Sequence, residues 1–184
     1  MLSIILTGAA LIREKEHGTV EHLLVMPVTA AEIMLSKIWT MGLVVLLASS
    51  FAITVVVKMA LQVPVAGSVP LFIAAAALML FATTSMGIFL ATMAGSMPQF
   101  GLLLMLVLFP LQVLSGGMTP RESMPDIIRA LMSLAPNTHF VILSQGVLFR
   151  DAGLGVVWPQ LLALAVIGGV LFWLALRQFR RFLA

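Results

Sequence analysis

The chain has 184 residues, of which 61% are hydrophobic and 9% are charged. Soluble domains carry about 45–50% apolar and about 25% charged residues, and disordered chains are rich in charge, so this composition excludes both classes. The absence of cysteine excludes disulfides, thiolate metal sites and cysteine nucleophiles. The net charge of +3 does not indicate nucleic-acid binding, which needs a basic stripe on a water-facing surface. The sequence therefore predicts an all-α membrane protein, a polytopic helix bundle.

The first apolar run, residues 1–12, is too short to cross a bilayer. Such a helix would be about 18 Å long, and the hydrocarbon core is about 30 Å thick. A signal peptide would carry a basic region before the apolar run, which this sequence does not have. We expect instead that the run is the end of a truncated span, so that the chain is the C-terminal part of a longer membrane protein.

Four long apolar intervals without internal charge predict full membrane spans. They are residues 39–57, 69–93, 100–115 and 156–176. The second and third are joined by a short break at residues 94–99, which contains Gly95 and Pro98. The third span contains Pro110, which predicts a kink whose freed carbonyl is satisfied by neighbouring groups. Continuous apolar runs of this length exclude the strands of a membrane barrel.

The distribution of Lys and Arg predicts the orientation of these spans. The segments 13–38, 94–99 and 177–184 would share one side, and residues 58–68 and the external segment 116–155 the other. The first side carries Arg13, Lys15, Lys37, Arg177, Arg180 and Arg181, and the second carries Lys58, Arg121, Arg129 and Arg150. Because cytoplasmic loops carry an excess of Lys and Arg, the bias favours the first side as cytoplasmic.

The densest polar segment is residues 13–27, which read Arg-Glu-Lys-Glu-His-Gly-Thr-Val-Glu-His-Leu-Leu-Val-Met-Pro. Gly18 can end the preceding helix, and Thr19 can cap a short amphipathic helix that has Glu21 in its first turn. Pro27 would end that helix. By themselves these residues leave two interpretations open: an interfacial helix that lies on lipid headgroups, or a docking helix for a cytoplasmic partner.

A capping box follows at Thr29 and Glu32, and it predicts the start of the helix that becomes the first full span. The whole segment from residue 13 to residue 38 therefore has the form of an elbow between two long helices.

The run Arg13-Glu14-Lys15-Glu16-His17-Gly18-Thr19-Val20-Glu21-His22-Leu23-Leu24, with Pro27 and Lys37 after it, resembles the signature of type-2 ATP-binding-cassette (ABC) transporter permeases. The resemblance covers nearly the whole chain, but only the C-terminal half of a full permease. It implies that residues 13–38 are a cytoplasmic coupling elbow that faces a separate ABC ATPase. The ATPase-coupling residues would be Arg13, Glu16, Gly18, Thr19, Glu21, Leu23, Leu24 and Pro27.

An external Pro-x-Thr-Tyr stretch is common in the same family. Here residues 136–140 read Pro-Asn-Thr-His-Phe, with His139 in the place of the tyrosine. Just before it, residues 120–136 predict an amphipathic helix with an Asp126–Arg129 pair. This helix would either lie on the membrane surface or fold back as a gate, and Asn137 or Thr138 would cap a second short helix that reaches Phe149.

Thr83, Gly87, Ala91 and Gly95 recur every four residues, which indicates a close helix contact. Two uses are open, namely packing within the chain or the seam of a dimer.

No catalytic, cofactor-binding or metal-ligating residues are predicted. The spacing of His17, Glu21 and His22 is one residue longer than a metalloprotease motif, and Gly18 interrupts the helix. The sequence contains no Gly-x-x-x-x-Gly-Lys-Ser/Thr run, so it predicts no ATPase site and no enzyme activity of its own. Any ATP would be bound by a partner subunit.

The resemblance implies a multi-pass permease subunit of an ATP-driven exporter in the inner membrane, surrounded by lipid and working as a homodimer or a heterodimer with another permease. The alternative is an ion-coupled transporter or channel-like protein, which would place ionisable residues inside its spans; the four predicted spans contain none. An intramembrane enzyme would need an Asp pair, a Ser–His pair or a metal set there. The substrate stays open among drugs, lipids, glycans and peptides.

Overall fold

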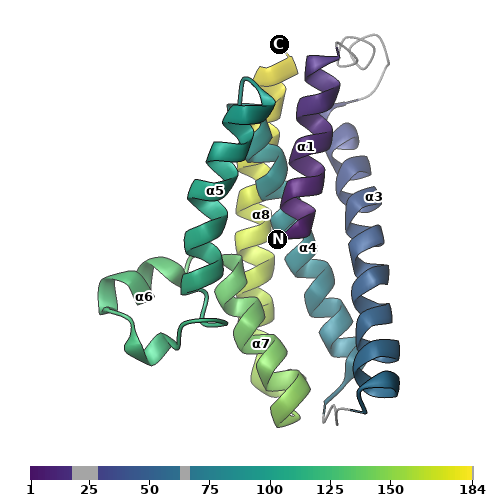
Figure 1. The fold of residues 1–184 in the computed structure, drawn as a ribbon, viewed down its shortest axis with the longest axis vertical. Coiled ribbons are helices and arrows are strands. Elements are labelled where there is room, and N and C mark those ends of the chain that lie inside the picture. Colours follow the sequence, from purple (N-terminus) through teal and green to yellow (C-terminus); the bar gives the residue numbers. More distant parts are fainter. Residues whose placement is uncertain (18–28, 63–66, 184) are drawn as a thin grey trace.

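The computed structural model describes residues 1–17, 29–62 and 67–183, and every regular element in these ranges is a helix. The helices form one elongated bundle (Figure 1). The predicted all-α membrane bundle is therefore confirmed. The helices are α1 (Leu2–Glu16), α3 (Ala30–Phe51), the π-helix η1 (Ala52–Ala60), α4 (Val69–Met93), α5 (Met97–Leu114), the 3-10 helix η2 (Arg121–Ser123), α6 (Asp126–Met132), α7 (Pro136–Arg150) and α8 (Leu154–Leu183).

The start of α3 is set by the predicted capping box. The Thr29 hydroxyl accepts a hydrogen bond from the Glu32 N–H at 3.3 Å, and the Glu32 carboxylate accepts one from the Thr29 N–H at 2.7 Å. Two of the free N–H groups of the first turn are satisfied in this way. The helix therefore begins at Ala30 and runs without a break into η1.

The other long helices agree in place with the predicted spans, and some extend beyond them. α4 occupies the predicted residues 69–93. α5 begins at Met97 rather than at residue 100, with Pro98 in the first turn, where its missing N–H costs nothing. α8 continues to Leu183 through the basic segment that was predicted as a tail.

Four helices in the described part of the chain are long and apolar enough to cross a membrane. They are Ala30–Ala60, Val69–Met93, Met97–Leu114 and Leu154–Arg181. The number agrees with the prediction from the charge-free intervals. α6 and α7 form a further apolar pair that is bent by 87° between Met132 and Pro136.

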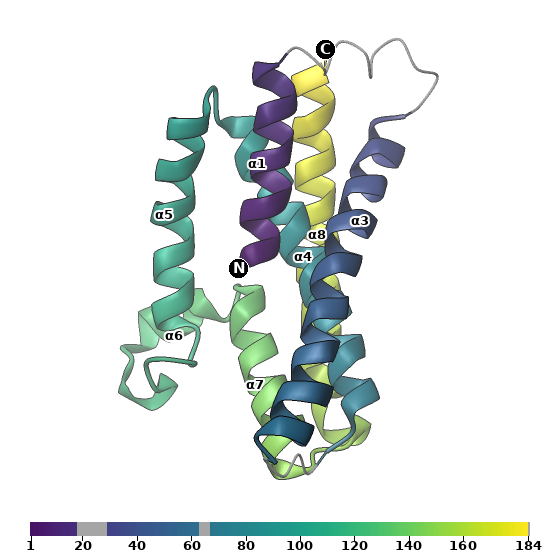
Figure 2. The same ribbon diagram turned by 45° about the vertical axis from the view of Figure 1, so that its right-hand side comes forward.

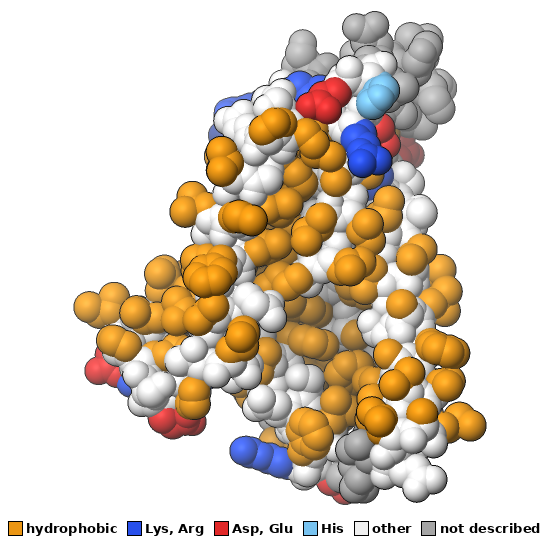
Figure 3. Space-filling view, viewed as in Figure 1, with side chains coloured by type: hydrophobic (Ala, Val, Ile, Leu, Met, Phe, Trp, Pro, Cys, Tyr) orange, Lys and Arg blue, Asp and Glu red, His pale blue; other side chains and the backbone are white. Residues whose placement is uncertain are grey.

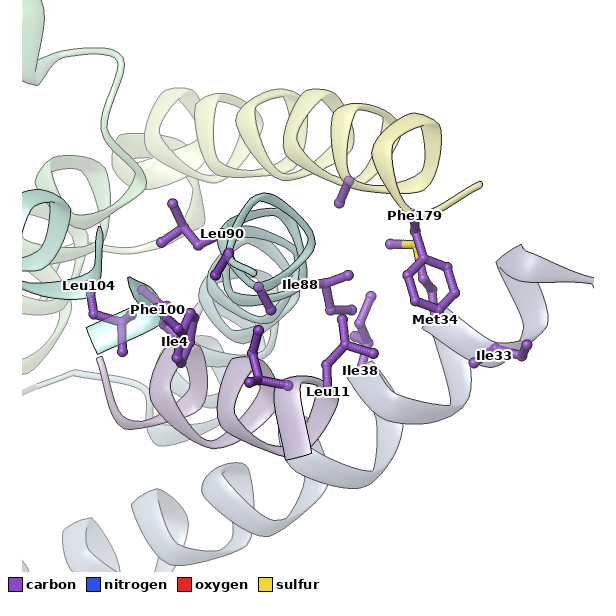
Figure 4. Packing of buried hydrophobic residues seen from close by; sticks show 14 residues of the cluster. Ile4, Leu11, Ile33, Met34, Ile38, Ile88, Leu90, Phe100, Leu104 and Phe179 are labelled. Atoms are coloured by element: carbon purple, nitrogen blue, oxygen red, sulfur yellow. The ribbon is translucent and has the colours of Figure 1, made fainter. Parts of the chain in front are cut away.

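α4 is the central helix of the bundle, and it packs against α1, α3, α7 and α8 (Figure 2). One buried cluster joins α1, α3, α4, α5 and α8 and includes Leu11, Met34, Ile88, Phe100 and Phe179 (Figure 4). A second cluster joins Ile53 of η1 to α4, α7 and α8. α3 is different, because its apolar surface faces mostly outward.

Each end of the bundle collects the segments that were predicted to share a side of the membrane. The end of α1, the start of α3, the α4–α5 connection and the end of α8 lie at one end, and the α7–α8 connection lies at the other (Figures 1 and 2). Hydrophobic side chains cover the face between the two ends of the bundle, and charged side chains gather at the ends (Figure 3). This distribution is typical of a protein that crosses a bilayer.

Candidate functional site

The structure describes only the two flanks of the predicted coupling elbow. Arg13 and Glu16 lie in the last turns of α1. The predicted coupling residues Gly18, Thr19, Glu21, Leu23, Leu24 and Pro27 lie outside the described residues. We call residues 13–17 of the first flank and residues 29–37 of the second the elbow base.

α1 ends at the elbow base through a local cap. The His17 N–H donates to the Arg13 carbonyl oxygen at 3.0 Å, and the His17 ring nitrogen Nδ1 donates to the same oxygen at 2.8 Å. Arg13 and Lys15 in the last turn favour the helix end, because cations stabilise the free carbonyl groups there. His17 thus serves the end of a helix in this structure.

An ion pair joins the two flanks of the elbow base. The Lys37 ammonium of α3 lies 2.5 and 2.6 Å from the two carboxylate oxygens of Glu14 in α1. The side chains of Lys37 and Glu14 are 17% and 33% exposed. Both residues belong to the segment that resembles the permease signature, but the sequence alone did not predict that they pair. The only signal was a pair of opposite charges on the two flanks.

Glu16 contacts a different helix from the one that Glu14 contacts. Its Oε1 accepts a hydrogen bond from the backbone N–H of Met97, the first residue of α5, at 2.9 Å. The side chain of Ser96, at the N-cap position, makes no capping bond. Glu16 therefore caps α5 across 81 positions of sequence. The resemblance implies an ATPase-coupling role for Glu16, and that role stays a prediction beside this contact within the chain.

Next to the ion pair, an open pocket of about 230 Å³ lies between α1 and α3. Its lining includes Glu14 and Lys37 at one end and Thr7 of α1, Thr40 and Met41 of α3. Within the described part of the chain, the buried hydroxyl of Thr7 has no hydrogen-bond partner. A pocket between the two helices thus borders the ion pair that joins them at the elbow base.

A larger cavity of about 490 Å³ lies near the start of α1. Ser3, Thr83, Gln112 and Asn137 are among its lining residues, together with apolar side chains of α3, α4 and α7. Its polar lining consists of hydroxyl and amide groups. The sequence alone did not indicate that these neutral polar groups would lie together.

A family model described as "ABC-2 family transporter protein" matches residues 1–177. The chain belongs to this family. It is 61% identical over 181 residues to the inner membrane transport permease YhhJ of Escherichia coli (strain K12), covering 98% of this chain and 48% of the relative. It is 29% identical over 181 residues (97% of this chain, 48% of the relative) to the probable multidrug ABC transporter permease YbhR of the same strain, and 30% identical over 175 residues (94% and 45%) to YbhS.

The chain spans about half the length of the curated relatives that it matches. The family and the apolar helices together identify the chain as a multi-pass inner-membrane protein of the ABC-2 transport permeases. The resemblance that the sequence indicated is confirmed at the level of the family.

Proposed function

We propose that the chain is the membrane-spanning part of a permease in an ATP-driven ABC exporter, and that residues 13–38 couple it to a separate ATPase subunit. The observation that carries this proposal is the position of the two described flanks of the elbow. α1 ends and α3 begins at the same end of the bundle (Figure 1), where Lys and Arg side chains gather (Figure 3). A force applied to the elbow at that place would act on both helices.

The two leucines of the elbow would supply most of the binding free energy. Burial of Leu23 and Leu24 in a groove of the ATPase would contribute about 3–6 kcal/mol, at about 1.5–3 kcal/mol each. An exposed charge pair contributes less than about 1 kcal/mol. Glu21 would therefore contribute less to the affinity for the ATPase than to the orientation of the elbow against it.

One observation favours ATP over an ion gradient as the energy source. Within the described ranges, the buried polar side chains are neutral Ser, Thr and Asn residues, whereas proton and ion relays use ionisable groups in the membrane. The sequence contains no P-loop motif, so the proposal places ATP hydrolysis on a separate subunit.

The proposal extends to assembly and to substrate class. We infer a dimer of permeases, with itself or with a related chain, each bound to one ATPase. Two relatives are named probable multidrug ABC transporter permeases, so drugs are the first substrates to test.

The coupling assignment can be tested by co-purification. The protein is expressed from its own genomic locus with an affinity tag, solubilised in detergent and purified, and its partners are identified by mass spectrometry. We expect an ABC ATPase that carries a P-loop. Leu23→Asp with Leu24→Asp should abolish its recovery without loss of membrane insertion.

A matched control places the same change at the other end of the bundle. Ile127 and Leu131 of α6 are exposed aliphatic residues far from the elbow base. The double variant Ile127→Asp with Leu131→Asp should leave the recovery of the ATPase unchanged. Recovery of the ATPase by the Leu23 and Leu24 double variant would show that the elbow is an interfacial helix only.

A further inference from the structure

Two carboxylates near the end of α1 bond to two different helices. Glu14 bonds to Lys37 of α3, and Glu16 bonds to the first N–H of α5. Residues two positions apart on a helix point to different sides, so this pair reaches both neighbours at once. Each contact joins α1 to a helix that lies far from it in the sequence, so no local sequence pattern predicts the contact.

The contact with Lys37 adds to the apolar packing at the start of α3. The buried residues of α3 are Ile33, Met34 and Ile38, which all flank Lys37 near the start of the helix. Beside Lys37, a pocket of about 230 Å³ lies between α1 and α3. Because the ion pair is mostly shielded from water, its attraction is stronger than that of an exposed pair. The elbow base is therefore the place where α1 and α3 are tied together.

The contact with Met97 extends the tie to a third helix. The free N–H groups at a helix start attract a carboxylate, which also interacts favourably with the helix dipole. The connection between α4 and α5 is short, from Ala94 to Ser96. It is itself closed by a hydrogen bond from the Gly95 N–H to Gln99 Oε1 at 2.7 Å. A displacement of Glu16 would thus move the start of α5 and the end of α4 together.

We propose that Glu14, Glu16 and Lys37 form a clamp that makes α1, α3 and α5 move as one body when the elbow is displaced. These three are positioning residues for transport, and they act within the chain instead of touching the ATPase. The inference rests on the proposed function, since it takes the elbow as the place where movement enters. Without the clamp, α3 would yield alone and the movement would not reach α5.

The test measures movement without a need for the natural substrate. Spin labels are attached to cysteines introduced at Leu47 of α3 and Leu102 of α5, which are both exposed, in the complex purified with its ATPase. Electron–electron resonance then gives the distance between the labels before and after addition of ATP with vanadate. We expect a clear shift in the parent protein, and a shift reduced to less than half in Glu14→Gln and in Lys37→Met.

Three further variants and a control separate a clamp from a general loss of structure. The reversed pair, Glu14→Lys with Lys37→Glu, should restore most of the shift. Glu16→Gln keeps an acceptor oxygen for Met97 and should behave like the parent, whereas Glu16→Leu should lose the shift. A matched control is Asp126→Asn, which removes the ion pair with Arg129 at the far end of the bundle and should leave the shift intact.

The outcomes distinguish this inference from the proposed function. Recovery of the ATPase by Glu14→Gln at the parent level, together with loss of the shift, supports the clamp. A full shift in Glu14→Gln, or no restoration in the reversed pair, overturns it. If the parent protein recovers no ATPase, the proposed function fails instead. The clamp is then judged on the resting distance distribution, which should broaden in Glu14→Gln and narrow again in the reversed pair; an unchanged width overturns it.

Discussion

Gly87 of α4 lies directly against the backbone of Ile4 in α1. A Cβ atom at residue 87 would lie 2.6 Å from the Ile4 carbonyl oxygen and 3.1 Å from the Ile4 Cα. Only a glycine lets the two backbones approach so closely. Thr83, one turn before Gly87, is buried next to the same helix and bonds to Ser3. The small residues at 83 and 87 therefore serve packing within the chain, which was one of the two uses that their spacing predicted.

We expect Gly87→Ala to destabilise the protein by about 1–3 kcal/mol, because the added methyl group meets backbone atoms that cannot move aside. The measurement is unfolding in mixed micelles at increasing denaturing detergent, followed by circular dichroism. Gly169→Ala in α8 is the control, since a Cβ there has no neighbour within 4 Å; it should be neutral or slightly stabilising. Equal stability of both variants would contradict the close contact.

The Ser3 and Thr83 hydroxyls lie 2.8 Å apart in the protein interior. Thr83 also lies 2.8 Å from the Met79 carbonyl oxygen, to which it donates, so Ser3 is the donor to Thr83. Thr83→Val should cost about 0.6 kcal/mol, the average for such bonds between membrane helices, and at most about 2 kcal/mol. Thr83→Ser should cost less. A double-mutant cycle with Ser3→Ala checks this, and full additivity would mean that the bond contributes nothing.

The sequence predicted the helices better than it predicted the contacts between them. Charge-free intervals and the Thr29–Glu32 box are local signals, and α3 and α4 follow them. The bonds of Glu14 and Glu16 join residues 23 and 81 positions apart. They depend on which helices become neighbours, and an apolar interval does not encode its neighbour. The cap on α5 was missed for this reason, and because the sequence analysis placed the start of this helix at residue 100 instead of Met97.

Removal of the α3 cap should be measurable. Thr29→Ala leaves the Glu32 N–H without its acceptor, and we expect a loss of about 1 kcal/mol of stability. Thr29→Ser keeps the hydroxyl and serves as the matched control. Hydrogen exchange should show faster exchange in the first turn of α3 in Thr29→Ala only, and equal exchange in both variants would count against the cap.

His139 fixes the corner between α6 and α7. Its ring nitrogen Nε2 donates to the Ser133 carbonyl oxygen at 2.7 Å, across the 87° bend. His139→Phe keeps an aromatic ring and removes the Nε2 donor, so we expect hydrogen exchange in residues 126–135 to accelerate several-fold. Phe149→Ala, at an exposed position of α7, is the control. If His139→Phe exchanges like the parent, other contacts hold the corner.

The two ends of the bundle should face opposite sides of the membrane, with the elbow base and the end of α8 in the cytoplasm. This chain has no cysteine, so single cysteines introduced at Ser123 and at Arg180 report their own positions. Ser123 lies in η2 and Arg180 is exposed near the end of α8. A membrane-impermeant maleimide added to intact spheroplasts should label residue 123 and not residue 180. In inverted vesicles the pattern should reverse.

A third cysteine makes the assay specific for accessibility. Leu164 is fully buried in the middle of α8, so a cysteine there should react in neither preparation before the membrane is dissolved. Labelling of residues 123 and 180 from the same side would overturn the topology, because α8 and the α6–α7 pair could then not be placed on opposite ends of a membrane-crossing bundle. Labelling from opposite sides but in the reverse sense would keep the bundle and invert the Lys and Arg argument. The elbow would then face away from any cytoplasmic ATPase, and the coupling proposal would fall with it.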